Sequence, residues 1–310
     1  MPDSRDRKAR KRDLTPEQRE KRQARRREKR HASPEVRFIL DNNTRVPVDL
    51  RPYSLNWDAA RIGDPSYYVI GLAKGGSTLM HELVRSLCEA AGRTYIDVPA
   101  ALFDQGVEPA RAVLDPDWLR SRDGSVFGGF RWLHPWMDNL ALHERRKIVM
   151  VRDPRDILTS LYFSHAYSHV APETGRLADT FDEQRTQARA QSIDDYVAGP
   201  VSLRVFRNYC HLLALTRMPD FRSYRYEDVI FEKRQWIRDL AADLDIRCPE
   251  DRLDAIADAH DRQPEAEDAS NHVRQVAPGD HVRKLKPETI DLLNRRFAPV
   301  LAEFGYGTAS

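Results

Sequence analysis

From residue 66 to residue 165, short apolar runs alternate with longer amphipathic stretches. Short apolar runs are typical of buried strands, whereas apolar residues at helical spacing predict helices. We expect strands at 67–71, 94–98, 126–130 and 147–151 and helices at 77–91, 136–143 and 154–165. Strands that alternate with helices form a parallel sheet with right-handed crossovers. The pattern therefore predicts an α/β fold with a central parallel β-sheet flanked by helices, in which ligands bind beyond the C-terminal ends of the strands.

The second half of the chain is mainly helical in pattern. Amphipathic spacing predicts helices at 201–218, 234–244, 253–260 and 287–304. Residues 168–195 are polar, and we expect them to form a mobile insertion. The Pro-, Asp- and Gly-containing stretch before residue 125 is expected to be irregular.

The first strand runs into Lys74-Gly75-Gly76-Ser77-Thr78, where the next helix begins. Two glycines allow backbone N–H groups to converge on an anion at the helix N-terminus, and Lys74 adds a positive charge. In the common nucleotide-triphosphate loop, Gly-x-x-x-x-Gly-Lys-[Ser/Thr], the lysine follows the glycines, whereas here it precedes them. The segment predicts a phosphate cradle of another kind, and a merely structural turn is the alternative.

A second candidate anion site follows the predicted strand 147–151. Arg152 comes directly after it, and Pro154 suits the first turn of a helix. A helix that begins near Asp153 offers both its dipole and Arg152 to an anion, with Ser160 about two turns further along. The alternative is that Arg152 and Asp156 pair at i, i+4 on a capped surface helix.

Taken together, these segments resemble motifs of the PAPS-dependent sulfotransferases, where PAPS is 3′-phosphoadenosine 5′-phosphosulfate. The first resembles the 5′-phosphosulfate loop Lys-Ser-Gly-Thr-Thr of that family. The second has the form of its 3′-phosphate motif, Arg-[Asn/Asp]-Pro-[Arg/Lys]-Asp with a serine eight residues after the arginine; Arg152 and Ser160 are both in place. The resemblance implies a P-loop-like sulfotransferase architecture.

Two further segments resemble the family in the expected order. Tyr226-Glu227-Asp228 is similar to a segment whose tyrosine lies against adenine. The stretch 274–281 is similar to Arg-Lys-Gly-x-x-Gly-Asp-Trp, with Arg274 and Gly279 retained and the lysine, first glycine and tryptophan replaced. Leu79 also departs from the pattern, because many cytosolic members have an adenine-stacking tryptophan at that position.

The resemblance implies that PAPS is the co-substrate and that the products include 3′,5′-adenosine bisphosphate; no metal is implied. Its binding residues would be Lys74, Gly75, Gly76, Ser77, Thr78, Arg152, Ser160, Tyr226, Arg274 and Gly279. Lys74 would also be catalytic, because it is placed to meet charge on the leaving oxygen. The family's basic histidine lies in Lys-Thr-His-Leu-Pro, and we assign that role to His134, one residue out of register in the stretch 131–135. A loop histidine bound to the backbone is the alternative.

The acceptor is expected to be a hydroxyl compound, either a carbohydrate or another small polar or lipid molecule. The polar insertion at 168–195 would lie near it. A P-loop kinase is the enzymatic alternative, and the lysine order and the lack of a clear magnesium-binding aspartate disfavour it.

Charge divides the chain unequally. Residues 1–30 contain 14 Lys and Arg against 6 Asp and Glu, whereas the whole chain has a net charge of +2. We expect a basic tail at 1–32, disordered or helical but detached, then an extended lead-in at 33–65 with an edge strand at 36–40, and the sulfotransferase domain at 66–310. The tail either aids solubility or contacts an anionic membrane surface or polyanion, so a polyanion-binding protein is a further alternative. No secretory signal or spanning segment is seen, so we expect a cytoplasmic location, with peripheral membrane contact through the tail as a variant.

Overall fold

The computed structural model describes residues 46–47, 66–104, 112–113, 124–133, 145–168, 176–261 and 276–308. The basic tail, the edge strand expected at 36–40 and the helix expected at 136–143 lie outside the described residues, as do His134 and Arg274. Within the described part of the chain, none of the helices combines the length and apolar character needed to cross a membrane.

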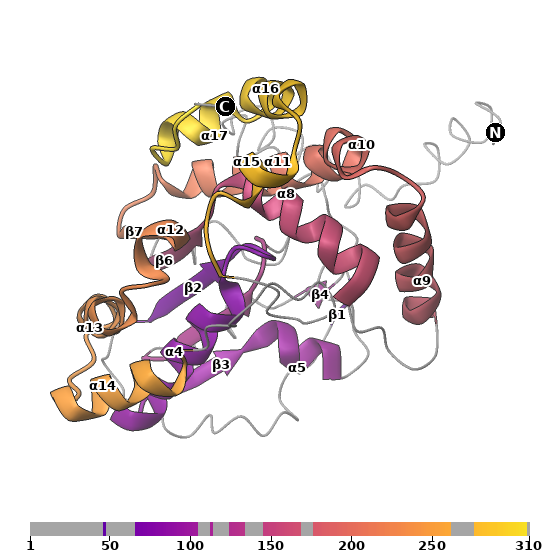
Figure 1. The fold of residues 1–310 in the computed structure, drawn as a ribbon. Coiled ribbons are helices and arrows are strands. Elements are labelled where there is room, and N and C mark those ends of the chain that lie inside the picture. Colours follow the sequence, from indigo (N-terminus) through magenta and orange to yellow (C-terminus); the bar gives the residue numbers. More distant parts are fainter. Residues whose placement is uncertain are drawn as a thin grey trace, which may run out of the picture. The chain divides into compact units, whose positions relative to one another are not determined.

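A five-stranded parallel sheet forms the centre of the fold (Figure 1). Its order is β3 (Tyr95–Asp97), β5 (Val126–Phe130), β2 (Tyr67–Gly71), β6 (Arg146–Val151) and β7 (Phe221–Arg225). All five residues of the central strand β2 are buried, as expected for a continuous apolar strand covered on both faces. A separate two-residue parallel pair joins β1 (Val46–Pro47) to β4 (Ala112–Val113).

Helices cover both faces of this sheet (Figure 1). One face carries α4 (Ser77–Ala91), α13 (Lys233–Asp243) and α14 (Glu250–Ala259). The other carries α8 (Pro154–Phe163), α11 (Pro200–Leu215), α10 (Ile193–Ala198) and α15 (Asp280–Lys284), with α16 (Pro287–Arg296) and α17 (Ala298–Glu303) nearby. The remaining elements are α5 (Val98–Asp104), the π-helix η3 (Ser164–Ser168), α9 (Arg176–Arg189) and α12 (Tyr226–Val229). The α/β fold with a helix-flanked parallel sheet was therefore predicted correctly.

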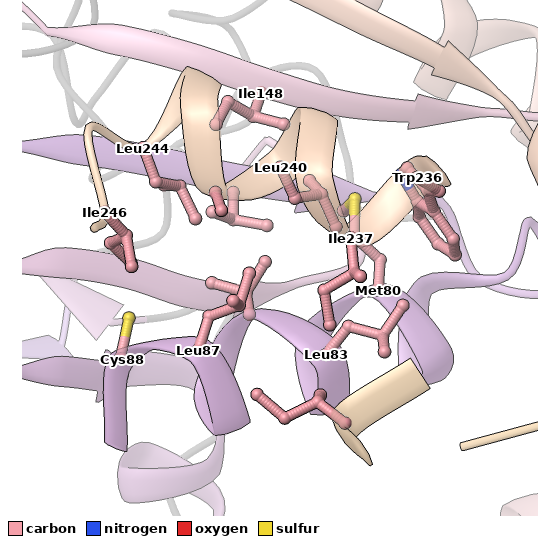
Figure 2. Close-up of a cluster of buried hydrophobic side chains, with 14 of the residues drawn as sticks. Met80, Leu83, Leu87, Cys88, Ile148, Trp236, Ile237, Leu240, Leu244 and Ile246 are labelled. Carbon is pink, nitrogen blue, oxygen red and sulfur yellow. The ribbon is translucent and has the colours of Figure 1, made fainter. Parts of the chain in front are cut away.

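The main core lies between α4, α13 and the sheet (Figure 2). Met80, Leu83 and Leu87 recur at helical spacing along α4 and meet Ile237 and Leu240 of α13. Burying each such side chain contributes about 1.5–3 kcal/mol. This packing fixes α4, and therefore the loop that precedes it, relative to the sheet.

Three expectations need correction. Residues 98–104, expected to be irregular, form α5, and the segment 168–195 contains α9 and the start of α10. Ser192 caps α10 by accepting a hydrogen bond from the backbone N–H of Asp195 at 3.1 Å, a local signal that overrides the polar composition. The expected terminal helix 287–304 divides at Phe297, because Pro299 has no N–H to continue the helical hydrogen bonds.

Candidate active site

The loop between β2 and α4 has an unusual backbone. Lys74 has φ 64° and Gly76 has φ 87°, both in the left-handed region, and the N–H of Gly75 donates to the carbonyl of Leu72 at 2.9 Å. A Cβ at position 76 would lie 2.6 Å from Cδ2 of Tyr226. Only glycine fits there without displacing that ring, so the second glycine allows the loop and Tyr226 to lie in contact.

Arg152 follows β6 directly and lies beside this loop. Its Nη1 donates to the carbonyl of Lys74 at 3.1 Å, and its guanidinium carbon lies 4.3 Å from the centroid of the Tyr226 ring. Asp153 caps α8 by accepting from the N–H of Arg155 at 2.9 Å. Nε of Arg152 is buried without a hydrogen-bond partner in the described part of the chain. A buried donor left unsatisfied is typical of a site that receives an acceptor group from a ligand.

Asp156 is not the surface partner that i, i+4 spacing suggested. Its side chain is fully buried, and Arg152 Nη2 is 3.8 Å from Oδ2. Besides this buried ion pair, it accepts hydrogen bonds from the N–H of Gly279 at 2.7 Å, and from the N–H and Nδ1 of His281 at 2.9 and 2.6 Å. Burial alone would raise the pKa of Asp156, but the hydrogen bonds from His281 and the charge of Arg152 lower it to about 2. The surface-helix interpretation is therefore wrong.

Tyr226 begins α12 at the end of β7. It is buried, its hydroxyl donates to the carbonyl of Val276 at 2.9 Å, and burial raises its pKa. The next residue, Glu227, accepts from the N–H of Asp153 at 2.9 Å and from the hydroxyl of Tyr306 at 3.0 Å. The segment thus places a ring in the site and holds the first turn of α8 beside it.

These elements enclose a pocket of about 230 Å³ at the C-terminal ends of β2 and β6. The predicted residues that line it are Lys74, Gly76, Ser77, Thr78, Arg152, Ser160 and Tyr226. Gly75 and Gly279 do not line it: Gly75 is buried in the loop, and the N–H of Gly279 donates to Asp156 at 2.7 Å. Leu133, next to the predicted base His134, is buried and apolar.

Sequence reasoning missed several residues of the pocket. Ser164 lies on the π-helix that extends α8, and its hydroxyl accepts a hydrogen bond from Nζ of Lys74 at 3.4 Å. Apolar spacing of 3.6 residues carries no signal for such a π-turn. Glu82 could have been found, because it shares the pocket-facing side of α4 with Thr78. His260, at the end of α14, has no comparable signal in the sequence.

The fold and pocket define an α/β protein that binds phosphate-bearing ligands, because two helix N-termini and two basic side chains meet where two adjacent parallel strands end. Residues 133–303, more than half of the chain, match the model of the sulfotransferase domain family. The chain therefore belongs to the sulfotransferase domain family, which confirms the resemblance to PAPS-dependent sulfotransferases. The matched region begins after the Lys74 loop. The structure places that loop beside Arg152, which lies within the matched region.

A solved structure with a TM-score above 0.5 agrees at the level of the fold. The chain is similar to a mouse sulfotransferase, SULT7A1, complexed with PAP, at 12% identity and a TM-score of 0.51, with 81% of this chain and 90% of that chain covered. It also matches a sulfotransferase from Alicyclobacillus acidocaldarius at 15% identity and a TM-score of 0.36, with 78% and 94% covered. A search of the curated proteins found no significant match to this chain.

Proposed function

We propose that this protein transfers a sulfuryl group from PAPS to a hydroxyl group of a carbohydrate or another small polar or lipid acceptor. The observation that carries the proposal is that Lys74, the N-terminus of α4, Arg152 and Ser160 all line the same pocket. Two separate anion-binding positions suit a nucleotide with phosphate groups at both its 5′ and 3′ positions.

The donor set fits this ligand. Backbone N–H groups at the start of α4, with the hydroxyls of Ser77 and Thr78, would bind the 5′-phosphosulfate. Arg152 and Ser160 would bind the 3′-phosphate, and the unsatisfied Nε of Arg152 supports that role. Tyr226 would lie against the nucleoside, while Arg274 and Gly279 are assigned to the same group by the resemblance alone.

PAPS supplies an activated sulfuryl group whose transfer leaves negative charge on the 5′-phosphate oxygen. Lys74 would stabilise that charge through Nζ, which already lies in the pocket. The hydrogen bond to Ser164 would orient the lysine side chain toward the line of transfer. His134 would accept the proton of the acceptor hydroxyl.

Polar side chains in the pocket lining outside the phosphate-binding set favour a polar acceptor. Arg131, Ser164 and Ser168 line the pocket together with the aromatic ring of Phe163. The ammonium group of Lys284 lies 5.6 Å from the centroid of that ring. Hydroxyl and cationic groups around one ring suit a sugar or another hydroxyl-rich molecule better than a flat phenol.

Calorimetric titration with 3′,5′-adenosine bisphosphate and with ATP, both without magnesium, tests the donor. We expect the bisphosphate to bind in the micromolar range or tighter and ATP to show no binding. Magnesium-dependent binding of ATP, with none of the bisphosphate, would contradict the proposal.

A further inference from the structure

The pocket is also lined by residues outside the phosphate-binding set, and we call the part that they form the compartment. Leu79, Ile230 and Val276 give it apolar walls. Glu82 and His260 are polar side chains that line the same pocket. This combination is suited to a planar group with an apolar face and a polar edge, as in a nucleobase.

Glu82 lies at a suitable distance from the phosphate site. It follows Ser77 by five residues on α4, which is about 7.5 Å along the helix axis. Thr78, Leu79 and Glu82 all line the pocket, so this face of α4 runs along its length. A ligand whose 5′-phosphate binds at the start of α4 would therefore extend its base toward the carboxylate.

His260 lies beside that carboxylate. Its Nδ1 is 3.5 Å from Oε2 of Glu82, and its Nε2 is 3.2 Å from Oγ of Ser86, one turn further along α4. The Glu82 side chain keeps 37% of its surface exposed. Nδ1 of His260 makes no hydrogen bond within the described residues, so the imidazole is an ion-pair neighbour of the carboxylate. The carboxylate still has capacity to accept hydrogen bonds from a ligand.

The end of α14, where His260 lies, is linked by hydrogen bonds to Ile230 of the pocket wall. Lys233 is buried, and its Nζ donates to the carbonyl of Ile230 and to Oδ1 of Asp261, each at 2.6 Å. One ammonium group therefore links an apolar wall residue to the neighbour of His260. Polar side chains on a rigid part of the fold can discriminate between ligands by hydrogen bonding.

We propose that Glu82, positioned by His260, reads the 6-amino group of the donor's adenine and rejects guanine. The assignment rests on the proposed PAPS-binding function. An ionised carboxylate only accepts hydrogen bonds, so opposite position 6 of the purine it pairs with the amino group of adenine and repels the 6-oxygen of guanine. Glu82 is then a specificity-determining residue and His260 a positioning residue.

Calorimetric titrations test this assignment with three ligands: 3′,5′-adenosine bisphosphate, the guanosine equivalent and the purine riboside equivalent that lacks the amino group. We expect the wild type to prefer the adenosine compound over each of the others by about tenfold to hundredfold, the value of one charge-assisted hydrogen bond. Glu82→Gln should reduce the preference over guanosine about tenfold or more, because an amide also donates to the 6-oxygen. His260→Ala should lower the same ratio part of the way.

Glu89→Gln is the matched control, because it removes the same charge from an exposed position of the same helix. It should leave all three affinities unchanged. Adenosine binding with no preference in the wild type, or an unchanged preference in Glu82→Gln, would overturn the role of Glu82 and leave the proposed function intact. Failure of the wild type to bind the adenosine compound would overturn the proposed function and this assignment with it.

Discussion

Asp156 and His281 are 125 positions apart in sequence, and their side chains meet at 2.6 Å in the interior. The backbone N–H of His281 also donates to Asp156, at 2.9 Å. One carboxylate therefore fixes the turn before α15 against the first turn of α8. Arg152 forms an ion pair with the same carboxylate, at 3.8 Å, so Asp156 also helps to orient the Arg152 guanidinium.

The first prediction concerns the pH dependence of this link. The folded pKa of Asp156, about 2, lies below its ordinary value, so its ionised form stabilises the fold above about pH 4 and this contribution is lost as the pH falls toward 2. Asp156→Asn should lower the free energy of unfolding by about 2 kcal/mol at pH 6. Urea unfolding at pH 6 and pH 3 should show about half of this difference lost at the lower pH. A difference that grows on acidification would contradict the assignment.

The second prediction separates two effects at the phosphate loop. Gly92→Ala, at the other end of α4, forces alanine to φ 63° with no atom within 4 Å of its Cβ, and should cost about 1–2 kcal/mol of stability. Gly76→Ala adds a clash with Tyr226 to a similar backbone cost, and should cost about 1–3 kcal/mol more. Thermal unfolding of both variants measures the difference. Equal losses would show that Tyr226 does not press on the loop.

The third prediction concerns Arg152. Arg152→Ala should weaken binding of 3′,5′-adenosine bisphosphate by about 2–4 kcal/mol and binding of 5′-AMP much less, because only the former has a 3′-phosphate. Arg222→Ala is the control, since Arg222 is largely exposed at the edge strand β7. Calorimetry with both nucleotides gives the comparison. If both ligands lost affinity equally, Arg152 would act at the 5′ end or on the scaffold.

The fourth prediction concerns Lys74. Its charge is needed mainly when the leaving oxygen becomes negative, so Lys74→Ala should reduce kcat about 10²- to 10³-fold while donor affinity falls less. Lys286→Ala, an exposed lysine outside the pocket lining, should leave kcat unchanged. Turnover with a responsive hydroxyl acceptor and direct donor titration together distinguish the two effects. A loss confined to donor affinity would assign Lys74 to binding only.

The fifth prediction concerns His134 as the base. We expect wild-type activity to decline at low pH as His134 is protonated. His134→Ala should reduce turnover about 10²- to 10⁴-fold and remove that decline. Near-full activity with the wild-type pH profile would place the base elsewhere. Arg131, which lines the pocket, and His165 would then be examined as acceptor-side groups, with the carboxylates of 168–195 as replacement bases.

Local sequence was enough to predict most of the central elements. The strand Tyr67–Gly71 and the helix Ser77–Ala91 begin and end where expected, because a continuous apolar run, two glycines and a helical apolar spacing are local properties. Lys74 and Arg152 were predicted as site residues from local anion-binding chemistry and Tyr226 from the family resemblance, and all three line the pocket. The family motifs are short contiguous segments, so they can be recognised in the sequence before the fold is known.

Tertiary structure decided how those stretches meet. That Gly76 has to be glycine depends on the ring of Tyr226, and the role of Asp156 depends on a loop more than 120 positions away. The pairing of Glu82 with His260 depends on α4 and α14 lying side by side. The sequence determined the local elements and the anion-binding residue types, because backbone preference and burial act over a few residues. Only the fold determined their partners, because contacts between distant segments form when the sheet brings its strand ends to one edge.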